Sequence, residues 1–316
     1  MIATSIILWA LVLIFIAFIY YVHWVEPVRL KTERIDIQIE TIPPELQDLR
    51  IAMFSDTHVR DHAGAVNVAR EAVRRVMKES PDIILIAGDV AHRSYYLQEA
   101  AEVLEPLQAP YGVYMVFGNH DRDFTLGLPR TKPTPDVVSM DAWMDTMDDI
   151  GINLLHNTPH ELVIGGKNML IVGVGDPSCG LDDLDGALEG APDADLKILL
   201  AHSPDIFDHP QAQWADLILC GHTHGGQIQI PGIGSPWAPV WRDRRRASGV
   251  MRLGDNTMAY VSRGVGSGTM ARFNCPPEIA ILTTTAGRAE DVRQINPLPV
   301  SRCRNVNVDG AKRLEA

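Results

Sequence analysis

The chain has 316 residues, a length that suits one large α/β domain or two smaller domains. It contains 28 Lys and Arg residues against 40 Asp and Glu residues, so its formal net charge is −12. This acidic balance argues against a nucleic-acid-binding protein, because affinity for a phosphate backbone comes from clustered basic side chains. A hydrophobic content of 46% excludes a disordered chain, and four scattered cysteines without a CxxC pair argue against a thiolate zinc site.

The first segment of the chain is long and apolar. Residues 6–25 read IILWALVLIFIAFIYYVHWV and contain no Asp, Glu, Lys or Arg, which is about the length that crosses a bilayer. Tyr20, Tyr21 and Trp24 cluster at one end, as in the aromatic belt of a membrane helix. A cleaved signal peptide fits less well, because no basic stretch precedes the segment and no small-residue cleavage site follows it. We therefore expect residues 1–28 to form an uncleaved transmembrane anchor.

The charges that flank this segment predict its orientation. Arg29, Lys31 and Arg34 follow it, whereas only the terminal amine precedes it. The positive-inside rule then places residues 26–316 in the cytoplasm. The expected location is the inner cell membrane, spanned once, with the lipid bilayer as a partner.

The rest of the sequence alternates between strand patterns and helical patterns. Isoleucines at positions 35, 37 and 39 alternate with polar residues, as in a half-buried strand. Apolar segments typical of strands buried on both faces recur at residues 49–54, 82–87, 113–117, 196–201 and 216–220. Helices are expected within residues 66–77, 94–107 and 136–149. Gly165-Gly166 is expected to close a hairpin, and the alternation as a whole predicts α/β architecture.

These patterns divide the chain into four expected parts. The parts are the anchor (1–28), a connecting strand and loop (29–48), one catalytic domain (49–285) and a loose C-terminal tail (286–316). One catalytic domain fits better than two independent ones, because no linker of low complexity interrupts residues 49–285.

A cluster of polar residues follows each of the five buried apolar segments. The clusters are Asp56-Thr57-His58, Gly88-Asp89, Gly118-Asn119-His120-Asp121, Ala201-His202 and Gly221-His222-Thr223-His224. The carboxyl ends of parallel strands meet at one edge of a sheet, so we expect these side chains to converge. Carboxylate, amide and imidazole groups are ligands that suit Mn, Fe, Zn or Ni. Seven ligands are too many for one ion, but they suit two ions that share a bridge.

Each motif alone has an ordinary explanation. A D-x-H triplet occurs by chance in many chains, a single histidine after a strand is more often a core or surface residue, and G-N-H-D can be a simple turn. The ordered set of five, each directly after an apolar segment, is far more specific. It favours a two-metal site of the kind that acts on phosphate esters.

The five motifs resemble the pattern of the calcineurin-like metallophosphoesterases, which is D-x-H, G-D, G-N-H-[DE], H and G-H-x-H. The resemblance runs from about Arg50 to Thr284, and the stretches GHTHGGQIQIPG (221–232) and RGVGSGTMARFNCPPEIAILT (263–283) are similar to one branch of that family. This branch includes bacterial membrane-associated or exported phosphoesterases, and membrane-anchored relatives that cleave UDP-diacylglucosamine in lipid A synthesis. The resemblance implies a four-layer α/β/β/α sandwich of two packed sheets with helices outside.

The resemblance also implies roles for individual residues. The first of two divalent ions would be bound by Asp56, His58, Asp89 and His224. The second would be bound by Asp89, Asn119, His202 and His222, so that Asp89 forms the bridge. His120 would lie beside the leaving group as a proton donor, with Asp121 orienting its ring. A hydroxide that bridges the two ions would attack phosphorus.

Cations after the G-H-T-H motif suggest where an anionic substrate binds. The stretch Trp241-Arg242-Asp243-Arg244-Arg245-Arg246 is the most basic one in the chain. Arg244, Arg245 and Arg246 would contact a second phosphate or a lipid headgroup, because guanidinium groups pair with phosphate in a bidentate manner. Arg263 would line the same cleft. The alternative is an ordinary solvated loop.

The leading hypothesis is a membrane-anchored, dinuclear metal-dependent hydrolase of phosphodiester or pyrophosphate bonds. Its substrate would be a phosphate ester or a nucleotide-lipid such as UDP-2,3-diacylglucosamine. A general phosphodiesterase of soluble esters, a protein phosphatase and a non-catalytic membrane scaffold are the alternatives. The complete ligand pattern argues against the scaffold.

Overall fold

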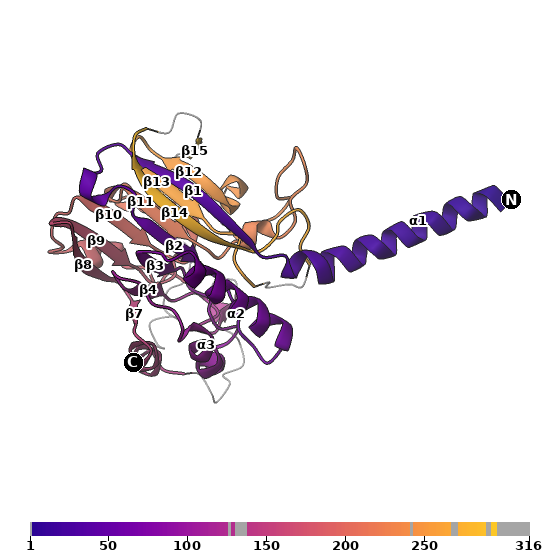
Figure 1. Cartoon of the computed structure of the whole chain (residues 1–316), viewed down its shortest axis with the longest axis horizontal. Helices are drawn as coiled ribbons and strands as arrows, with labels where there is room; N and C mark the ends of the chain where they lie inside the picture. The colour runs from indigo at the N-terminus through magenta and orange to yellow at the C-terminus, as the bar shows by residue number, and fades with distance from the viewer. Residues whose placement is uncertain are drawn as a thin grey trace.

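Two β-sheets pack face to face, helices lie outside them, and one long helix projects from this body (Figure 1). The computed structural model describes residues 2–125, 128–129, 138–240, 243–266, 271–288 and 292–295. The helices are α1 (Ile2–Tyr20), α2 (Ala63–Lys78), α3 (Leu97–Leu104), α4 (Met140–Asp149) and α5 (Leu184–Leu188).

The first sheet has the strand order β1-β14-β2-β3-β4-β7. Its strands are β1 (Lys31–Ile39), β2 (Arg50–Phe54), β3 (Ile83–Ile86), β4 (Val113–Val116), β7 (Ile152–Leu155) and β14 (Glu278–Ala286). Strands β2, β3, β4 and β7 are parallel neighbours, so their carboxyl ends lie at one edge of the sheet. A separate small hairpin follows β4 and consists of β5 (Phe124–Thr125) and β6 (Leu128–Pro129).

The second sheet has the strand order β15-β12-β13-β11-β10-β9-β8. Its strands are β8 (Thr158–Ile164), β9 (Lys167–Gly173), β10 (Leu196–Leu200), β11 (Leu217–Cys220), β12 (Gly249–Leu253), β13 (Thr257–Val261) and β15 (Arg293–Ile295). The central strands β9, β10, β11 and β13 are parallel, so this sheet also has one edge of carboxyl ends. Strands β8 and β9 form the hairpin predicted at Gly165-Gly166.

Three buried hydrophobic clusters separate four layers. One cluster lies between the first sheet and the helices α2, α3 and α4, and a second fills the space between the two sheets. The third covers the outer face of the second sheet, where Leu184 of α5 and Phe207 pack on strand residues such as Leu199. This arrangement confirms the four-layer α/β/β/α sandwich.

The apolar segments became strands because both of their faces are buried. In β3, Ile84 and Ile86 pack in the helix-side cluster, while Ile83 and Leu85 pack between the sheets. Alternate residues of a strand point to opposite faces, so a strand in the middle of a sandwich must be apolar at every position.

Two segments form longer or additional strands than the sequence predicted. Strand β1 pairs in parallel with β14 over its whole length, from Lys31 opposite Glu278 onwards. Residues Arg293–Ile295, which were expected to be part of a loose tail, pair with β12 as β15, because Ile295 is buried in the third hydrophobic cluster. Residues 296–316 of the expected tail lie outside the described part of the chain.

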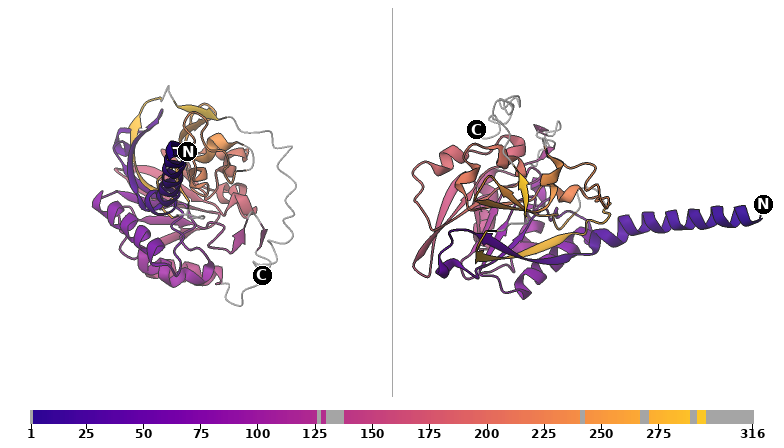
Figure 2. Two further views of the ribbon diagram at one scale, coloured as in Figure 1. Left: turned by 90° about the vertical axis from the view of Figure 1, so that its right-hand side faces the viewer. Right: turned by 90° about the horizontal axis from the view of Figure 1, so that it is seen from above.

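Helix α1 projects away from the body, and Phe18 near its C-terminal end contacts Phe273 of the body (Figure 2). It continues through a π-helical turn at Tyr21–Val25 and a 3-10 turn at Glu26–Val28. The segment Thr4–Val28 contains an 18-residue window with a mean hydropathy of 2.6, of which 6% is buried, so by length and composition the helix could cross a membrane.

Candidate metal centre

The polar clusters of the sequence come together where the carboxyl edges of the two sheets meet. Asp56 and His58 follow β2, Asp89 follows β3, Asn119 follows β4, His202 follows β10, and His222 and His224 follow β11. Since β2, β3 and β4 are neighbours in one sheet and β10 and β11 in the other, the fold itself brings these side chains together.

One group consists of Asp56, His58 and His224, all of which are buried. The Nε2 atoms of His58 and His224 are 3.0 Å apart. The Oδ1 atom of Asp56 is 3.5 Å from His224 Nε2 and 3.9 Å from His58 Nε2. Ligands bound at about 2.1 Å from one ion are separated by roughly 3.0–3.4 Å, so these three atoms nearly outline one coordination site.

A second group consists of Asp89, His202 and His222. Asp89 Oδ2 is 3.3 Å from His202 Nε2, and His202 Nε2 is 3.1 Å from His222 Nδ1. The same Asp89 oxygen is only 3.7 Å from His58 Nε2 of the first group. Asp89 therefore lies between the two groups, where a bridging carboxylate would have to be.

Unpartnered buried oxygens test whether cations fit this site. Among the residues that the structure describes, Asp56 Oδ1 and Asn119 Oδ1 are buried and accept no hydrogen bond. The amide of Asn119 is oriented by Nδ2, which donates to the carbonyl of Phe124 at 3.2 Å, so Oδ1 is left as an unused acceptor. Buried polar atoms are nearly always satisfied, and divalent cations at the two groups would satisfy these oxygens. The donor set therefore fits two metal ions.

Burial and charge set the protonation of these groups before a cation binds. Burial lowers the pKa of His222 to about 4 and lowers the pKa of His58 and His224 well below the usual value, so these imidazoles are neutral. Burial raises the pKa of the Asp56 carboxyl to about 7. Because metal ligands must be unprotonated, the neutral imidazoles are ready to bind and Asp56 must release a proton.

Asp89 and His202 behave as a buried ion pair in the absence of a cation. Burial would raise the pKa of Asp89, but the attraction of His202 outweighs it and holds that pKa well below its usual range. Burial would likewise lower the pKa of His202, but Asp89 raises it well above the usual value. A cation bound here would replace the proton of His202.

The backbone of this site is held in an uncommon conformation. Five of the seven residues have a left-handed backbone, namely Asp56 (φ 56°), His58 (φ 45°), Asp89 (φ 54°), His222 (φ 68°) and His224 (φ 50°). Such a conformation costs of order 1–3 kcal/mol for a residue other than glycine, and it persists only where the surroundings impose it. Conformations of this kind are concentrated at functional sites, so the backbone supports the assignment of this cluster as the active centre.

Two glycines allow the strand-end loops to approach each other. A Cβ atom at Gly118 would lie 2.1 Å from Asp89 Oδ1, and one at Gly221 would lie 2.6 Å from Asp56 Oδ2. Any side chain at these positions would displace a carboxylate of the centre.

His120 and Asp121 lie beside this centre, but their relation differs from the expected one. The ring of His120 is 4.6 Å from that of His58, measured between centroids, and its Nδ1 is 3.1 Å from the main-chain carbonyl of His92. The carboxylate of Asp121 instead accepts hydrogen bonds from the main-chain N–H groups of Asp89, Gly118 and Ala91, at 2.8, 2.9 and 2.9 Å. Asp121 therefore ties together the loops of Asp89 and His120, and the carbonyl of His92 faces the His120 ring.

The arginine segment does not form one substrate-binding surface. Arg246 is buried, donates to Asp208 at 2.9 Å and lies over the ring of Phe207. This corrects the expectation that Arg246 contacts substrate, because its charge is already neutralised inside the protein.

The two arginines before it are exposed and already bonded to neighbours. Arg245 pairs with Asp243 at 2.7 Å, and Arg244 donates to the carbonyl of Pro236. Trp241 and Arg242, the first residues of the same basic stretch, lie outside the described residues.

Arg263 is also committed to carboxylates. Its guanidinium pairs with Glu33 of β1 and Glu278 of β14, and its main-chain N–H donates to Glu278 at 2.8 Å. These contacts tie the connection after β13 to the first sheet and leave Arg263 poorly suited to bind substrate.

Arg272, which was not predicted as a site residue, is a buried cation next to the centre. Its Nη2 lies 3.4 Å from Nδ1 of His224 and 2.9 Å from the carbonyl of Arg263. After burial, the charge of Arg272 is the largest influence that lowers the pKa of His224. The signal was available, because Arg272 lies inside the stretch 263–283 that carries the family resemblance.

The sandwich fold and the groups of metal-ligating side chains at its strand ends are those expected of a phosphoesterase of the α/β/β/α class. The model of the calcineurin-like phosphoesterases matches residues 49–226, more than half of the chain. The chain therefore belongs to the calcineurin-like metallophosphoesterase family, and it is a metal-dependent phosphoester hydrolase.

Three known proteins illustrate the similarity. Phosphodiesterase YaeI of Escherichia coli is 31% identical over 265 residues, which cover 83% of this chain and 91% of that protein. UDP-2,3-diacylglucosamine pyrophosphatase LpxG of Chlamydia trachomatis is 26% identical, with coverages of 83% and 91%. Among solved structures, the 5′-nucleotidase precursor from Thermus thermophilus is 16% identical with a TM-score of 0.44; the match covers 74% of this chain and 54% of that chain.

Proposed function

We propose that this protein is a membrane-anchored phosphodiesterase or pyrophosphatase with a dinuclear metal centre. The observation that supports the dinuclear centre best is the position of Asp89. Its Oδ2 lies 3.3 Å from a histidine nitrogen of one group and 3.7 Å from a histidine nitrogen of the other. A single isolated ion would not require a carboxylate oxygen between the two groups of histidines.

The proposed ligand sets use every side chain of the cluster. One ion would be held by Asp56, His58, Asp89 and His224, and the other by Asp89, Asn119, His202 and His222. The donor types suit Mn, Fe, Zn or Ni. When bound, two such ions supply Lewis-acid stabilisation of the phosphoryl oxygens and activation of water.

The protein supplies the proton for the leaving group through His120. Its ring is partly exposed next to His58, and the His92 carbonyl fixes Nδ1, so Nε2 is the atom that can reach an ester oxygen. Asp121 accepts three hydrogen bonds from main-chain N–H groups and so holds the loops of Asp89 and His120 together.

A nucleotide-lipid such as UDP-2,3-diacylglucosamine is the proposed substrate, which would place the reaction in lipid A biosynthesis. Two observations support an amphiphilic substrate: the similarity to LpxG and the contact of the apolar helix with the loop beside His224. The similarity to phosphodiesterase YaeI favours the alternative, a phosphodiesterase with a broader range of esters.

The proposed location is the inner cell membrane, spanned once by residues 1–28, with the catalytic domain in the cytoplasm. The charges of Arg29, Lys31 and Arg34 after the helix support this orientation. Reporters fused to the C-terminus test it: a cytoplasmic fluorescent protein should be bright, and a phosphatase that folds only after export should be inactive. The opposite pattern would mean that the catalytic domain is exported.

A metal-reconstituted activity panel tests the chemistry. The full chain in detergent is loaded with Mn, Fe, Zn or Ni and assayed with bis-p-nitrophenyl phosphate, p-nitrophenyl phosphate and UDP-2,3-diacylglucosamine. Hydrolysis of the diester and the pyrophosphate, but little of the monoester, is the expected result. Activity on the diester alone would favour the broader phosphodiesterase, and failure on all three would contradict the proposal.

A further inference from the structure

Exposed apolar side chains are concentrated in one loop of the catalytic domain. Beyond Val28, six large hydrophobic residues are exposed in the part of the chain that the structure describes. Four of them lie within residues 228–237: Ile228, Ile230, Ile233 and Trp237. Ile233 is 73% exposed and Trp237 is 62% exposed, and such a grouping on an acidic protein indicates an interaction surface.

This apolar loop (residues 228–237) has a defined structure. The main-chain N–H of Gly234 donates to the carbonyl of Ile230 at 2.8 Å, which closes a tight turn. At its base, Gln229 and Phe273 are linked by a hydrogen bond from the Gln229 N–H to the Phe273 carbonyl at 2.9 Å. The apolar side chains are therefore displayed on a fixed turn.

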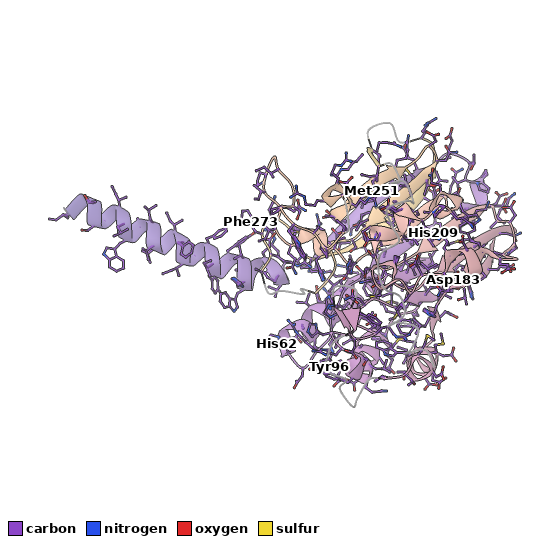
Figure 3. All side chains as sticks on the ribbon, turned by 180° about the vertical axis from the view of Figure 1, so that it is seen from behind. His62, Tyr96, Asp183, His209, Met251 and Phe273 are labelled. Carbon is purple, nitrogen blue, oxygen red and sulfur yellow. The ribbon has the colours of Figure 1, made fainter. Side chains whose placement is uncertain are left out.

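The base of the apolar loop is attached to the N-terminal helix. The ring of Phe273 packs edge-on against the ring of Phe18, with 5.3 Å between centroids. The adjacent Arg272 N–H donates to the carbonyl of Val22 at 2.9 Å. Figure 3 shows Phe273 at the junction of the helix and the body, beside the projecting loop that follows β11.

The position of Phe18 within the apolar segment determines how deep in a bilayer its contact with Phe273 would lie. Phe18 lies inside the candidate span Thr4–Val28 and precedes Trp24 by six residues, which is about 9 Å along a helix. If the helix crosses a bilayer with Trp24 in the headgroup region, Phe18 is at the boundary of the hydrocarbon core. Phe273, and the apolar loop attached to it, are then at the same level.

Three arginines share a cavity with the apolar loop. A cavity of about 700 Å³ is lined by Ile233 of the loop together with Arg244, Arg245 and Arg293. Asp243 pairs with Arg245 in this cavity, so the three arginines still outnumber the acidic residue. Apolar side chains close to such cations match the chemistry of an anionic membrane surface, in which acyl chains lie beneath charged headgroups.

We propose that residues 228–237 form a second membrane contact, which inserts into the interface of an anionic bilayer beside the helix. The inference rests on the anchoring proposed above. The loop begins four residues after His224, and the Gln229 side chain donates to the carbonyl of Gly225, so the metal centre lies next to the membrane surface. A substrate held in the bilayer would therefore reach the centre without leaving the interface.

Depth-dependent quenching in liposomes tests this contact. The full chain is reconstituted in phosphatidylethanolamine–phosphatidylglycerol vesicles, with single cysteines introduced by Ile233→Cys, Trp9→Cys or Val163→Cys and labelled with a polarity-sensitive fluorophore. Cys179, Cys220 and Cys275 are buried, and Cys303, which lies outside the described residues, is replaced by Ser. Trp9 of α1 reports on the anchor, and Val163, 68% exposed on β8, is the control for an exposed apolar residue.

We expect lipids brominated near the headgroup end of the acyl chain to quench position 233 at least about half as strongly as position 9, because an interfacial segment penetrates about 5–10 Å. Position 163 should not be quenched. Quenching at position 9 together with none at 233 would overturn the inference and leave the anchor intact, and it would indicate a loop in water or one covered by another protein. Absence of quenching at position 9 would overturn the anchor as well as the inference. Trp237→Cys gives a second reading of the same loop if Ile233→Cys does not fold.

Discussion

The G-H-T-H motif and the arginine segment belong to the same connection between β11 and β12, yet the fold uses them differently. His222 and His224 point to a centre that they share with the ends of four other strands. Arg244, Arg245 and Arg246 each bond to a different neighbour, and Arg246 is buried. Both segments contain several residues of one type close together in the sequence. This clustering alone therefore did not indicate which segment contributes to the metal centre.

The difference follows from how each position is fixed. A residue directly after a buried strand is placed by the sheet, and the sequence shows which residues follow each apolar segment. A residue in the middle of a long connection is placed by partners from elsewhere in the chain. For Arg246 those partners are Asp208 and Phe207, which nothing in the basic stretch itself identifies.

The largest expected effect concerns the bridging carboxylate. Asp89→Asn removes charge from both groups, so we expect the metal content to fall from two ions per chain to one or none, with loss of activity. Mass spectrometry of metals in the purified protein measures this. Asp216→Asn is a matched control, because Asp216 accepts a hydrogen bond from the Lys197 N–H far from the centre. Two retained ions in Asp89→Asn would contradict the bridge.

His120 should separate catalysis from metal binding. In His120→Ala, both ions should remain bound, because His120 is outside the proposed ligand sets. The rate on bis-p-nitrophenyl phosphate should fall by about 10²–10⁴, the usual effect of removing a positioned proton donor. Steady-state kinetics with metal analysis of the same sample measures both, and an unchanged rate would remove His120 from the mechanism.

The arginine segment should contribute to stability at one position only. Arg246→Ala removes a buried guanidinium that pairs with Asp208 and lies over the ring of Phe207, so the free energy of unfolding should fall by about 3–5 kcal/mol. Arg245→Ala removes an exposed pair and should leave the free energy of unfolding nearly unchanged. Urea denaturation of the two variants measures the difference. Equal effects would mean that the two arginines have equivalent surroundings.

Metal affinity should depend on pH through the same buried groups. In the absence of a cation, burial raises the pKa of Asp56 to about 7, and Asp89 raises that of His202 above its usual value. Both protons must leave before a cation binds, so affinity should rise with pH and fall at least about tenfold per unit below pH 7. Calorimetric titration between pH 5.5 and 8 measures this, and a pH-independent affinity would exclude proton release.

Much of the fold could be predicted from apolar periodicity. The unbroken segments gave β2, β3, β4, β10 and β11, since strands buried on both faces need apolar residues throughout. Strand β15 could not be predicted, because its three residues are a strand only through pairing with β12.

The residues that form the candidate metal centre could be predicted from the sequence. The contacts that hold these residues in place could not. The side chains that follow the strands converge, as their positions indicated. The hydrogen bonds of Asp121 to three main-chain N–H groups, and the place of Arg272 against His224, depend on loops that meet only in the folded protein.

Electron paramagnetic resonance of the Mn²⁺-loaded protein tests whether two metal ions share the Asp89 carboxylate. Two Mn²⁺ ions about 3.5–4 Å apart that share the Asp89 carboxylate would be magnetically coupled. At saturation, we expect a coupled-pair spectrum in the wild-type protein and its loss in Asp89→Asn. A saturated wild-type protein that shows only the six-line signal of isolated Mn²⁺ would contradict a shared dinuclear centre.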